Sequence, residues 1–186
     1  LCTLHAEWVD HLVCISNDMH RTMVRRYGFP NTKCRLIHNG TFDPGHSGNF
    51  DPRDPGTLRI VCSGGWNRDK GGPRIMRSIL EHRQAWRNVR LDWFGNVPDK
   101  IQARVADVPG IRFRGQVAQP EFFEAHEAAD VLVFASSKEG CPMTMLEAMS
   151  LGVLPIATDG VGAMRWLIDS GREGFVCHLE DWSRQL

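Results

Sequence analysis

Short apolar runs alternate with amphipathic stretches along most of the chain. The apolar runs predict strands at residues 11–16, 34–38, 58–62, 89–94, 111–114, 131–135, 154–158 and 174–177. The amphipathic stretches predict helices at residues 18–27, 73–86, 99–106, 120–128, 142–150 and 161–168. Regular alternation with short connections predicts an α/β fold with a doubly wound parallel sheet, in which ligands bind beyond the carboxyl ends of the strands.

One segment interrupts this alternation. Residues 43–56 contain three prolines and three glycines and show no hydrophobic periodicity, a composition that is typical of a linker. The chain starts at Leu1, and residues 182–186 have the pattern of an opening helical turn. We therefore expect the sequence to be part of a longer protein.

The most informative candidate site lies where strand 131–135 gives way to helix 142–150. Glu139 falls in the turn, and Glu147 falls about five residues into the helix, roughly 7–8 Å along its axis. Pro142 suits the first helical position, and the N–H groups of the first turn favour an anion. The pattern predicts hydroxyl acceptors on both sides of a phosphate cradle, as a sugar nucleotide requires. Taken singly, each glutamate is also explained as a helix-dipole partner or a solvated acid.

A glycine-rich loop, SGGWNRDKGG, follows strand 58–62. Gly64 and Gly65 allow the backbone to approach a ligand closely, and Arg68 and Lys70 supply cations for phosphate. The loop matches neither the Walker A pattern nor the dinucleotide-binding G-x-G-x-x-G pattern, and a generic turn with solvated cations explains it equally well. If both loops lie at one edge of the sheet, Lys70 and the first turn of helix 142–150 converge on one diphosphate.

Two further strand ends carry small and polar residues. Gly95 and Asn96 follow one predicted strand, and Gly115, Gln116 and Val117 follow the next. Main-chain groups at these positions are candidates for holding a planar base. Glycine after a strand is common, so these residues indicate a base site only in combination with the two loops above.

Composition excludes several classes of function. The chain has 22 basic and 22 acidic residues, so it shows no electrostatic footprint of a nucleic-acid partner. No apolar run approaches the length of a membrane span, which leaves only peripheral membrane contact open. The six cysteines are scattered without a C-x-x-C pair, which favours small buried side chains in a reducing compartment over a disulfide framework or zinc site. Cys141 has no activating neighbour in sequence, so we assign it to packing.

Residues 137–149, SKEGCPMTMLEAM, followed by GVLPIATD at 152–159, resemble the donor-site signature of GT-B retaining glycosyltransferases of family 4 (group 1). Further positions that match this family are Lys70-Gly71-Gly72, Gly95, Gly115, Asp130-Val131, Gly162 and the run from Gly171 to Phe175. The resemblance covers essentially the whole chain. It implies that residues 1–45 are the end of an acceptor-binding domain and the start of the linker, 46–56 the linker, and 57–186 a Rossmann-like donor-binding domain.

The resemblance also implies a role for each site residue. Glu139 would contact hydroxyls of the donor sugar, Glu147 would accept hydrogen bonds from the ribose, and Lys70 would bind the diphosphate and offset its charge as it leaves. The family pattern places further donor contacts at Gly140, Cys141, Pro142, Met143 and Thr144.

The implied partners are a nucleotide sugar and a saccharide or lipid-linked acceptor, with no essential metal or other cofactor. The enzyme would act in polysaccharide biosynthesis in the cytoplasm. Peripheral contact with the inner face of the membrane would be made through the missing N-terminal half.

Two positions depart from the family pattern. Gly65 stands where the family usually has an arginine that acts with the lysine, which makes Arg68 the candidate replacement. The linker start reads Asn-Gly-Thr-Phe at 39–42, so that Asp43 comes one place late. Because of the first departure, a non-catalytic nucleotide-sugar-binding module remains an alternative to the enzyme. We expect the chain alone to be inactive. A nicotinamide-dependent oxidoreductase lacks its fingerprint here and is rejected.

Overall fold

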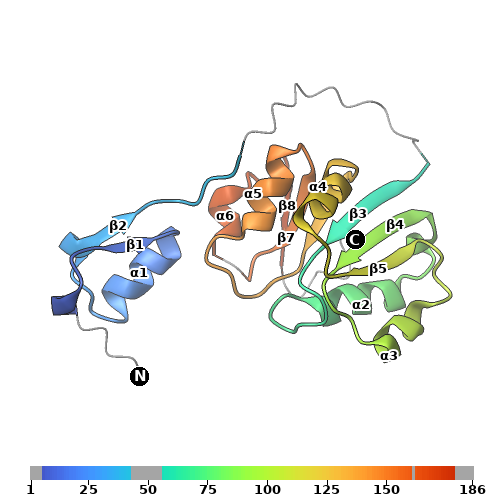
Figure 1. Ribbon diagram of the computed structural model, residues 1–186, viewed down its shortest axis with the longest axis horizontal. Coiled ribbons are helices and arrows are strands. Elements are labelled where there is room, and N and C mark those ends of the chain that lie inside the picture. Colours follow the sequence, from blue (N-terminus) through green and yellow to red (C-terminus); the bar gives the residue numbers. More distant parts are fainter. Residues whose placement is uncertain (1–5, 43–55, 161, 179–186) are drawn as a thin grey trace.

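The computed structural model describes residues 6–42, 56–160 and 162–178 (Figure 1). Nearly all of the predicted linker, at 43–55, lies outside the described residues. The first described range forms two parallel strands, β1 (Leu12–Cys14) and β2 (Cys34–Leu36), joined through α1 (Asn17–Arg25). A 3-10 turn precedes each strand: η1 (Ala6–Trp8) comes before β1, and η2 (Asn31–Lys33) comes before β2.

The second unit is a six-stranded parallel sheet in the order β5-β4-β3-β6-β7-β8. Its strands are β3 (Leu58–Cys62), β4 (Val89–Phe94), β5 (Ile111–Gly115), β6 (Val131–Phe134), β7 (Leu154–Thr158) and β8 (Phe175–Cys177). The strand order reverses between β3 and β6, so this pair is the topological switch point. In open α/β sheets the ligand crevice lies at the carboxyl ends of the strands at such a point.

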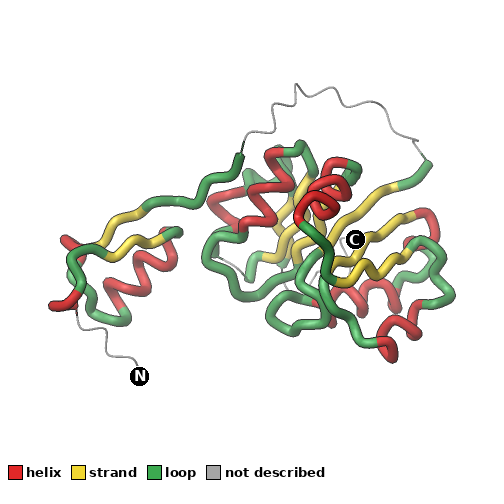
Figure 2. Tube along the Cα trace, viewed as in Figure 1, coloured by secondary structure: helices red, strands yellow, loops and turns green. Residues whose placement is uncertain are grey.

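Helices cover both faces of this sheet, as Figure 2 shows in red against the yellow strands. They are α2 (Gly72–Glu81), α3 (Asp99–Gln102), α4 (Gln119–Glu127), α5 (Met143–Ser150) and α6 (Met164–Leu167), with the 3-10 turns η3 (Ala85–Asn88) and η4 (Ala103–Val105). Apolar residues of α2 and α3 pack in one core cluster, and those of α4, α5 and α6 pack in the other. The predicted doubly wound α/β fold is confirmed.

The central strand β6 shows why its sequence is continuously apolar. Val131 and Val133 are buried in the cluster on the α2 side, whereas Leu132 and Phe134 are buried in the cluster on the α5 side. A strand whose alternate side chains enter two cores must be apolar at every position.

Three helices are shorter than the sequence predicts by three residues or more. The helix expected at 73–86 ends at Glu81, because His82 leaves the helical region (φ −123°, ψ 37°). The helix expected at 99–106 tightens after Gln102 into a 3-10 turn, whose Val105 is buried in the α2-side cluster. The described helical part of the stretch expected at 161–168 runs from Met164 to Leu167.

The described cysteines are core residues. Cys14, Cys34, Cys62, Cys141 and Cys177 are buried and carry free thiols, as the packing assignment predicts. Burial raises the pKa of the Cys141 thiol, which disfavours the nucleophilic thiolate. Among the described residues, no helix has the length and apolar character needed to cross a bilayer.

Candidate functional site

Two loops meet at the switch point between β3 and β6. The Ser137 N–H donates to the Asp69 carbonyl at 2.7 Å, and the Lys138 ammonium lies 3.2 Å from the Asp69 carboxylate. Gly71 comes so close to the second loop that a Cβ there would overlap the Ala135 carbonyl oxygen, and its φ is +85°. Only glycine satisfies both conditions, so this residue allows the glycine-rich loop to dock.

The glycine-rich loop is shaped by its own side chains. Asn67 Oδ1 accepts from the backbone N–H groups of Asp69 at 2.8 Å and Lys70 at 3.1 Å, an Asx turn that fixes the position of the lysine backbone. Arg74, in the first turn of α2, donates through Nη1 to the carbonyls of Ala135 at 3.1 Å and Arg68 at 3.3 Å. Burial and the neighbouring Arg68 cation lower the pKa of Arg74.

Lys70 and Glu139 form an ion pair across the two loops. The lysine side chain is 46% exposed, whereas the glutamate side chain is only 14% exposed. Ser136 Oγ donates to Glu139 Oε1 at 3.1 Å, and Thr158 Oγ1 in turn donates to the Ser136 carbonyl. The acid is therefore fixed by buried neighbours, while the lysine can turn towards another anion at small cost, because half-exposed ion pairs contribute little.

Helix α5 supplies the acceptor and donors that the sequence predicts. Glu147 is half-buried, and burial raises its pKa. Within the described ranges no hydrogen bond reaches its carboxylate. Pro142 is the N-cap residue, and the N–H groups of Cys141, Met143 and Thr144 have no acceptor among the described residues. The first turn of the helix thus keeps the unbonded donors of an anion site.

The strand ends after β4 and β5 continue the same edge. The Trp66 N–H donates to the Asn96 carbonyl at 2.7 Å, and the Gly95 N–H donates to the Gly115 carbonyl at 2.6 Å. The structure therefore joins the predicted base-binding positions to the glycine-rich loop. Of the following pair, Gln116 is exposed and Val117 packs against the α5-side cluster.

Gly65 has no space for a side chain. Its φ is +60°, and a Cβ would lie 2.6 Å from the Asn96 carbonyl oxygen and 2.8 Å from the Asn96 nitrogen. An arginine at this position would require the turn after β4 to move. Arg68 is exposed, and Arg74 and the Gly71 N–H donate hydrogen bonds to its carbonyl oxygen. The replacement of the family arginine by the Arg68 side chain stays a prediction.

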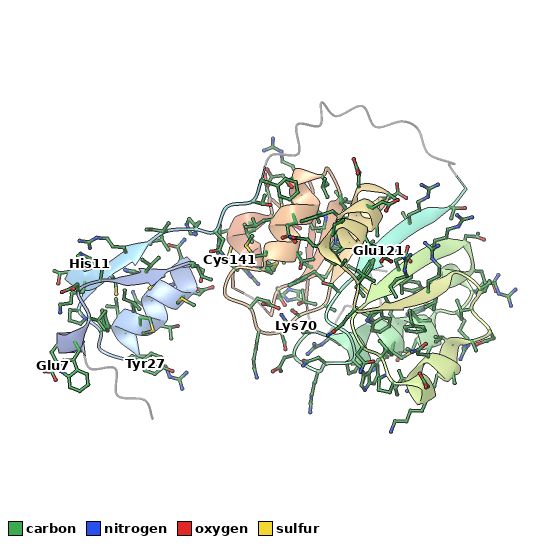
Figure 3. The ribbon with its side chains drawn as sticks, in the orientation of Figure 1. Glu7, His11, Tyr27, Lys70, Glu121 and Cys141 are labelled. Carbon is green, nitrogen blue, oxygen red and sulfur yellow. The ribbon has the colours of Figure 1, made fainter. Side chains whose placement is uncertain are left out.

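The first described range borders this site. Asn39 Nδ2 donates to the Cys141 carbonyl at 3.3 Å, and the ring of His38 lies 4.3 Å from that of Trp166, centroid to centroid. A Cβ on Gly140 would lie 3.4 Å from Ile15 Cδ1. Figure 3 shows Cys141 on the side of the sheet that faces this range.

Some of these residues were not predicted from the sequence. Arg74, Ser136 and Asn39 all hold parts of the two loops in place. Arg74 and Ser136 belong to no motif, and the sequence marks Asn39 only as part of the linker start. For Ser136 a signal existed, because it is the first polar residue after a fully buried strand. The described part of the chain contains no group of three or more His, Cys, Asp or Glu residues placed to hold a metal ion.

The family profile and the related sequences that match this chain are all glycosyltransferases. The sequence profile of "Glycosyl transferases group 1" matches residues 57–186. A D-inositol 3-phosphate glycosyltransferase of Pseudarthrobacter chlorophenolicus is 30% identical over 142 residues, covering 70% of this chain and 34% of that protein. One from Streptomyces scabiei is 32% identical over 82 residues, covering 44% of this chain and 18% of that protein. The chain thus spans about a third of these relatives or less.

Solved structures share the fold at low sequence identity. TarM of S. aureus, in a complex that includes UDP, superposes with a TM-score of 0.81 at 14% identity over 98% of this chain and 37% of TarM. WaaG, a glycosyltransferase of lipopolysaccharide biosynthesis, gives 0.73 at 16% identity over 93% of this chain and 51% of WaaG.

Proposed function

Because the chain belongs to the glycosyl transferases of group 1, we propose that it is the donor-binding part of a retaining glycosyltransferase. The whole enzyme transfers a hexosyl group from a nucleotide-diphosphate sugar to a saccharide or lipid-linked acceptor, in polysaccharide biosynthesis. The convergence of Lys70, Glu139 and the first turn of α5 at one switch point supports this proposal most directly.

The diphosphate lies between Lys70 and the N-terminus of α5. Lys70 exchanges its ion pair with Glu139 for the phosphate oxygens, and the N–H groups of Met143 and Thr144 donate to the same group. These positive groups also stabilise the charge that develops as the nucleoside diphosphate leaves. Lys70 and Glu139 are therefore the proposed catalytic pair.

The two glutamates hold the two ends of the donor. Glu139, released from the lysine but still bonded to Ser136, accepts hydrogen bonds from the sugar hydroxyls. Glu147 accepts from the ribose hydroxyls, which supplies its half-buried carboxylate with the hydrogen bonds that the described residues do not give it. The acceptor attacks on the face from which the diphosphate departs, so the anomeric configuration is retained.

The setting of the enzyme is part of the proposal. Lys70 and the helix N-terminus provide positive charge at the diphosphate, so the reaction needs no essential metal or other cofactor. We place the enzyme in the cytoplasm, with peripheral contact to the inner face of the membrane through its acceptor-binding half. The chain alone binds donor weakly and turns over little.

A non-catalytic nucleotide-sugar-binding module is the second candidate, and the geometry at Gly65 favours it. The turn after β4 leaves no space there for the cation that the family uses beside its lysine. A site with one cation binds the diphosphate but stabilises its departure less.

A nucleotide panel tests the donor site. We expect UDP, GDP or ADP to raise the melting temperature of the chain, and Glu147→Ala to reduce that shift, whereas Glu81→Ala, an exposed acid on α2, leaves it unchanged. Equal shifts in the two variants contradict the site. With the acceptor-binding half restored, NMR of the released sugar separates the candidates: a retained anomer supports the enzyme, and tight binding without hydrolysis or transfer supports the module.

A further inference from the structure

A concave surface lies away from the donor loops, on the sheet face that α4 partly covers. It is a cavity of about 360 Å³, and four of its lining residues are arginines: Arg59, Arg90, Arg112 and Arg114. They come from β3, β4 and β5. The apolar lining consists of Ile60, Val61, Ala125 of α4, and Ala128 and Ala129, which follow that helix. We call this space the arginine cavity.

Two of the arginines stand directly opposite each other. Arg59 of β3 is the register partner of Arg90 of β4, so both side chains leave the same face of the sheet from strands about 4.8 Å apart. Like charges placed opposite each other destabilise a sheet. Neither guanidinium makes an ion pair or hydrogen bond with any residue in the described ranges.

Most of the acids that line the arginine cavity are already paired with Arg112 or Arg114. Asp92 pairs with both Arg112 and Arg114, and Arg114 also pairs with Glu121 of α4, the acid labelled in Figure 3. Glu124 is the remaining lining acid. Two paired arginines thus form one wall, while Arg59 and Arg90 face the space with a single uncommitted acid beside them.

A pair of unpaired guanidinium groups on one face matches the chemistry of a phosphate group. Each planar fork can donate two parallel hydrogen bonds to a phosphate oxygen pair, and a phosphate between two arginines converts their repulsion into attraction. We propose that the arginine cavity binds the phosphate group of a second ligand, distinct from the donor. The group belongs to a soluble phosphorylated molecule or to the headgroup of an anionic lipid.

This proposal does not depend on the donor site. The donor loops follow the carboxyl ends of β3 and β6, whereas Arg59 and Arg90 are the second residues of β3 and β4. A simpler explanation is that Arg59 and Arg90 are only solvated charges on this face of the sheet. The two explanations differ in whether the unpaired arginines bind a phosphate group.

The test uses the full 186-residue chain carrying Lys70→Ala, so that phosphate binding by the donor loops is weakened. Inorganic pyrophosphate is titrated by calorimetry, and sedimentation is measured with vesicles of phosphatidylcholine alone or mixed equally with phosphatidylglycerol. Arg59→Gln and Arg90→Gln are added to this background. Arg77→Gln, an exposed arginine on α2 at the opposite face, is the matched control.

We expect Arg59→Gln and Arg90→Gln each to weaken binding of one probe about tenfold, with a melting temperature that is unchanged or higher because the repulsion is relieved. Loss of pyrophosphate binding identifies a soluble ligand, and loss limited to phosphatidylglycerol vesicles identifies a lipid headgroup; both support the cavity. If neither probe binds, or if Arg77→Gln weakens binding as much as Arg59→Gln and Arg90→Gln do, the proposal is overturned. Because Lys70 is already removed, the outcome does not depend on the proposed glycosyl transfer.

Discussion

Lys70 and Glu139 neutralise each other across the two loops of the switch point, although 69 positions separate them in the chain. The lysine is the more exposed partner, and the glutamate is additionally held by Ser136. In the proposed donor site, a diphosphate that binds the lysine must therefore first release the acid. The same event would free a fixed carboxylate for the sugar, so the proposal predicts that diphosphate binding and sugar recognition are coupled through one ion pair.

Lys70→Ala tests this coupling. Removal of the cation should weaken nucleoside diphosphate binding about tenfold or more, because a charge-assisted hydrogen bond to phosphate is lost. Lys138→Ala is the matched control, since that lysine is 75% exposed and pairs with Asp69 in the same pair of loops. Calorimetric titration of the three proteins with the best nucleotide of the panel gives the comparison, and similar losses in both variants would show that only net charge matters.

Glu147 should make the stability of the fold depend on pH. Burial raises its pKa, so the native state holds the proton more tightly than the unfolded state. The free energy of unfolding must then fall as pH rises from the ordinary glutamate pKa, about 4.3, through the raised value. Glu147→Gln lacks this titration and should be more stable than the wild type above that range, with little difference below it.

Urea unfolding at acidic and neutral pH measures the effect. Glu81→Gln is the control, because an exposed acid should leave the pH dependence unchanged. Nucleotide affinity should change in the opposite direction, falling as pH drops and Glu147 becomes protonated. A wild-type affinity that stays constant across this range argues against a ribose contact by the carboxylate.

Gly71→Ala should destabilise the chain by about 3 kcal/mol or more, because a left-handed backbone and a clash with the Ala135 carbonyl combine. Gly171→Ala separates the two causes. Its φ of +91° is similar, but a Cβ there meets nothing within 4 Å, so only the conformational cost of about 1–2 kcal/mol applies. Chemical denaturation of both variants measures the difference, and equal costs would refute tight docking of the glycine-rich loop.

Asn39→Ala should loosen the turn before α5. The side-chain hydrogen bond to the Cys141 carbonyl contributes about 1 kcal/mol, which corresponds to roughly fivefold faster amide exchange at residues 139–144 if that turn opens locally. Asn31→Ala, at an exposed position in η2, should leave this exchange unchanged. Hydrogen exchange followed by mass spectrometry gives the answer.

The bounds of strands were predictable where the side chains of the strand pack into both core clusters. The bounds of β3, β4 and β7 agree with the sequence, because their apolar runs end where the loops begin. Helix ends were less predictable. The end of α2 depends on the backbone of His82, and nothing in the amphipathic pattern of 73–86 marks that residue as a stop.

The two loops of the switch point could be placed from sequence because glycine, proline and charge lie at fixed offsets from strand ends. The bonds between the loops could not, since Arg74 reaches the Ala135 carbonyl across 61 positions. The arginine cavity was missed for a different reason. Arg112 and Arg114 alternate with Ile111 and Phe113, a pattern that indicates one polar sheet face, but the sequence does not show which charges of the neighbouring strands share that face.

The pairing of β3 with β6 has a kinetic consequence. The backbone N–H of Arg59 donates to the Asp130 side chain, 71 positions away. The glycine-rich loop is bonded to the loop after β6 over separations of 68 and 69 positions. Neither half of the proposed diphosphate site can therefore form while its own segment folds alone. Long-range pairing is slow compared with the formation of local turns and helices. After dilution from denaturant, nucleotide binding should return only with the slowest folding phase, well after most of the helical signal.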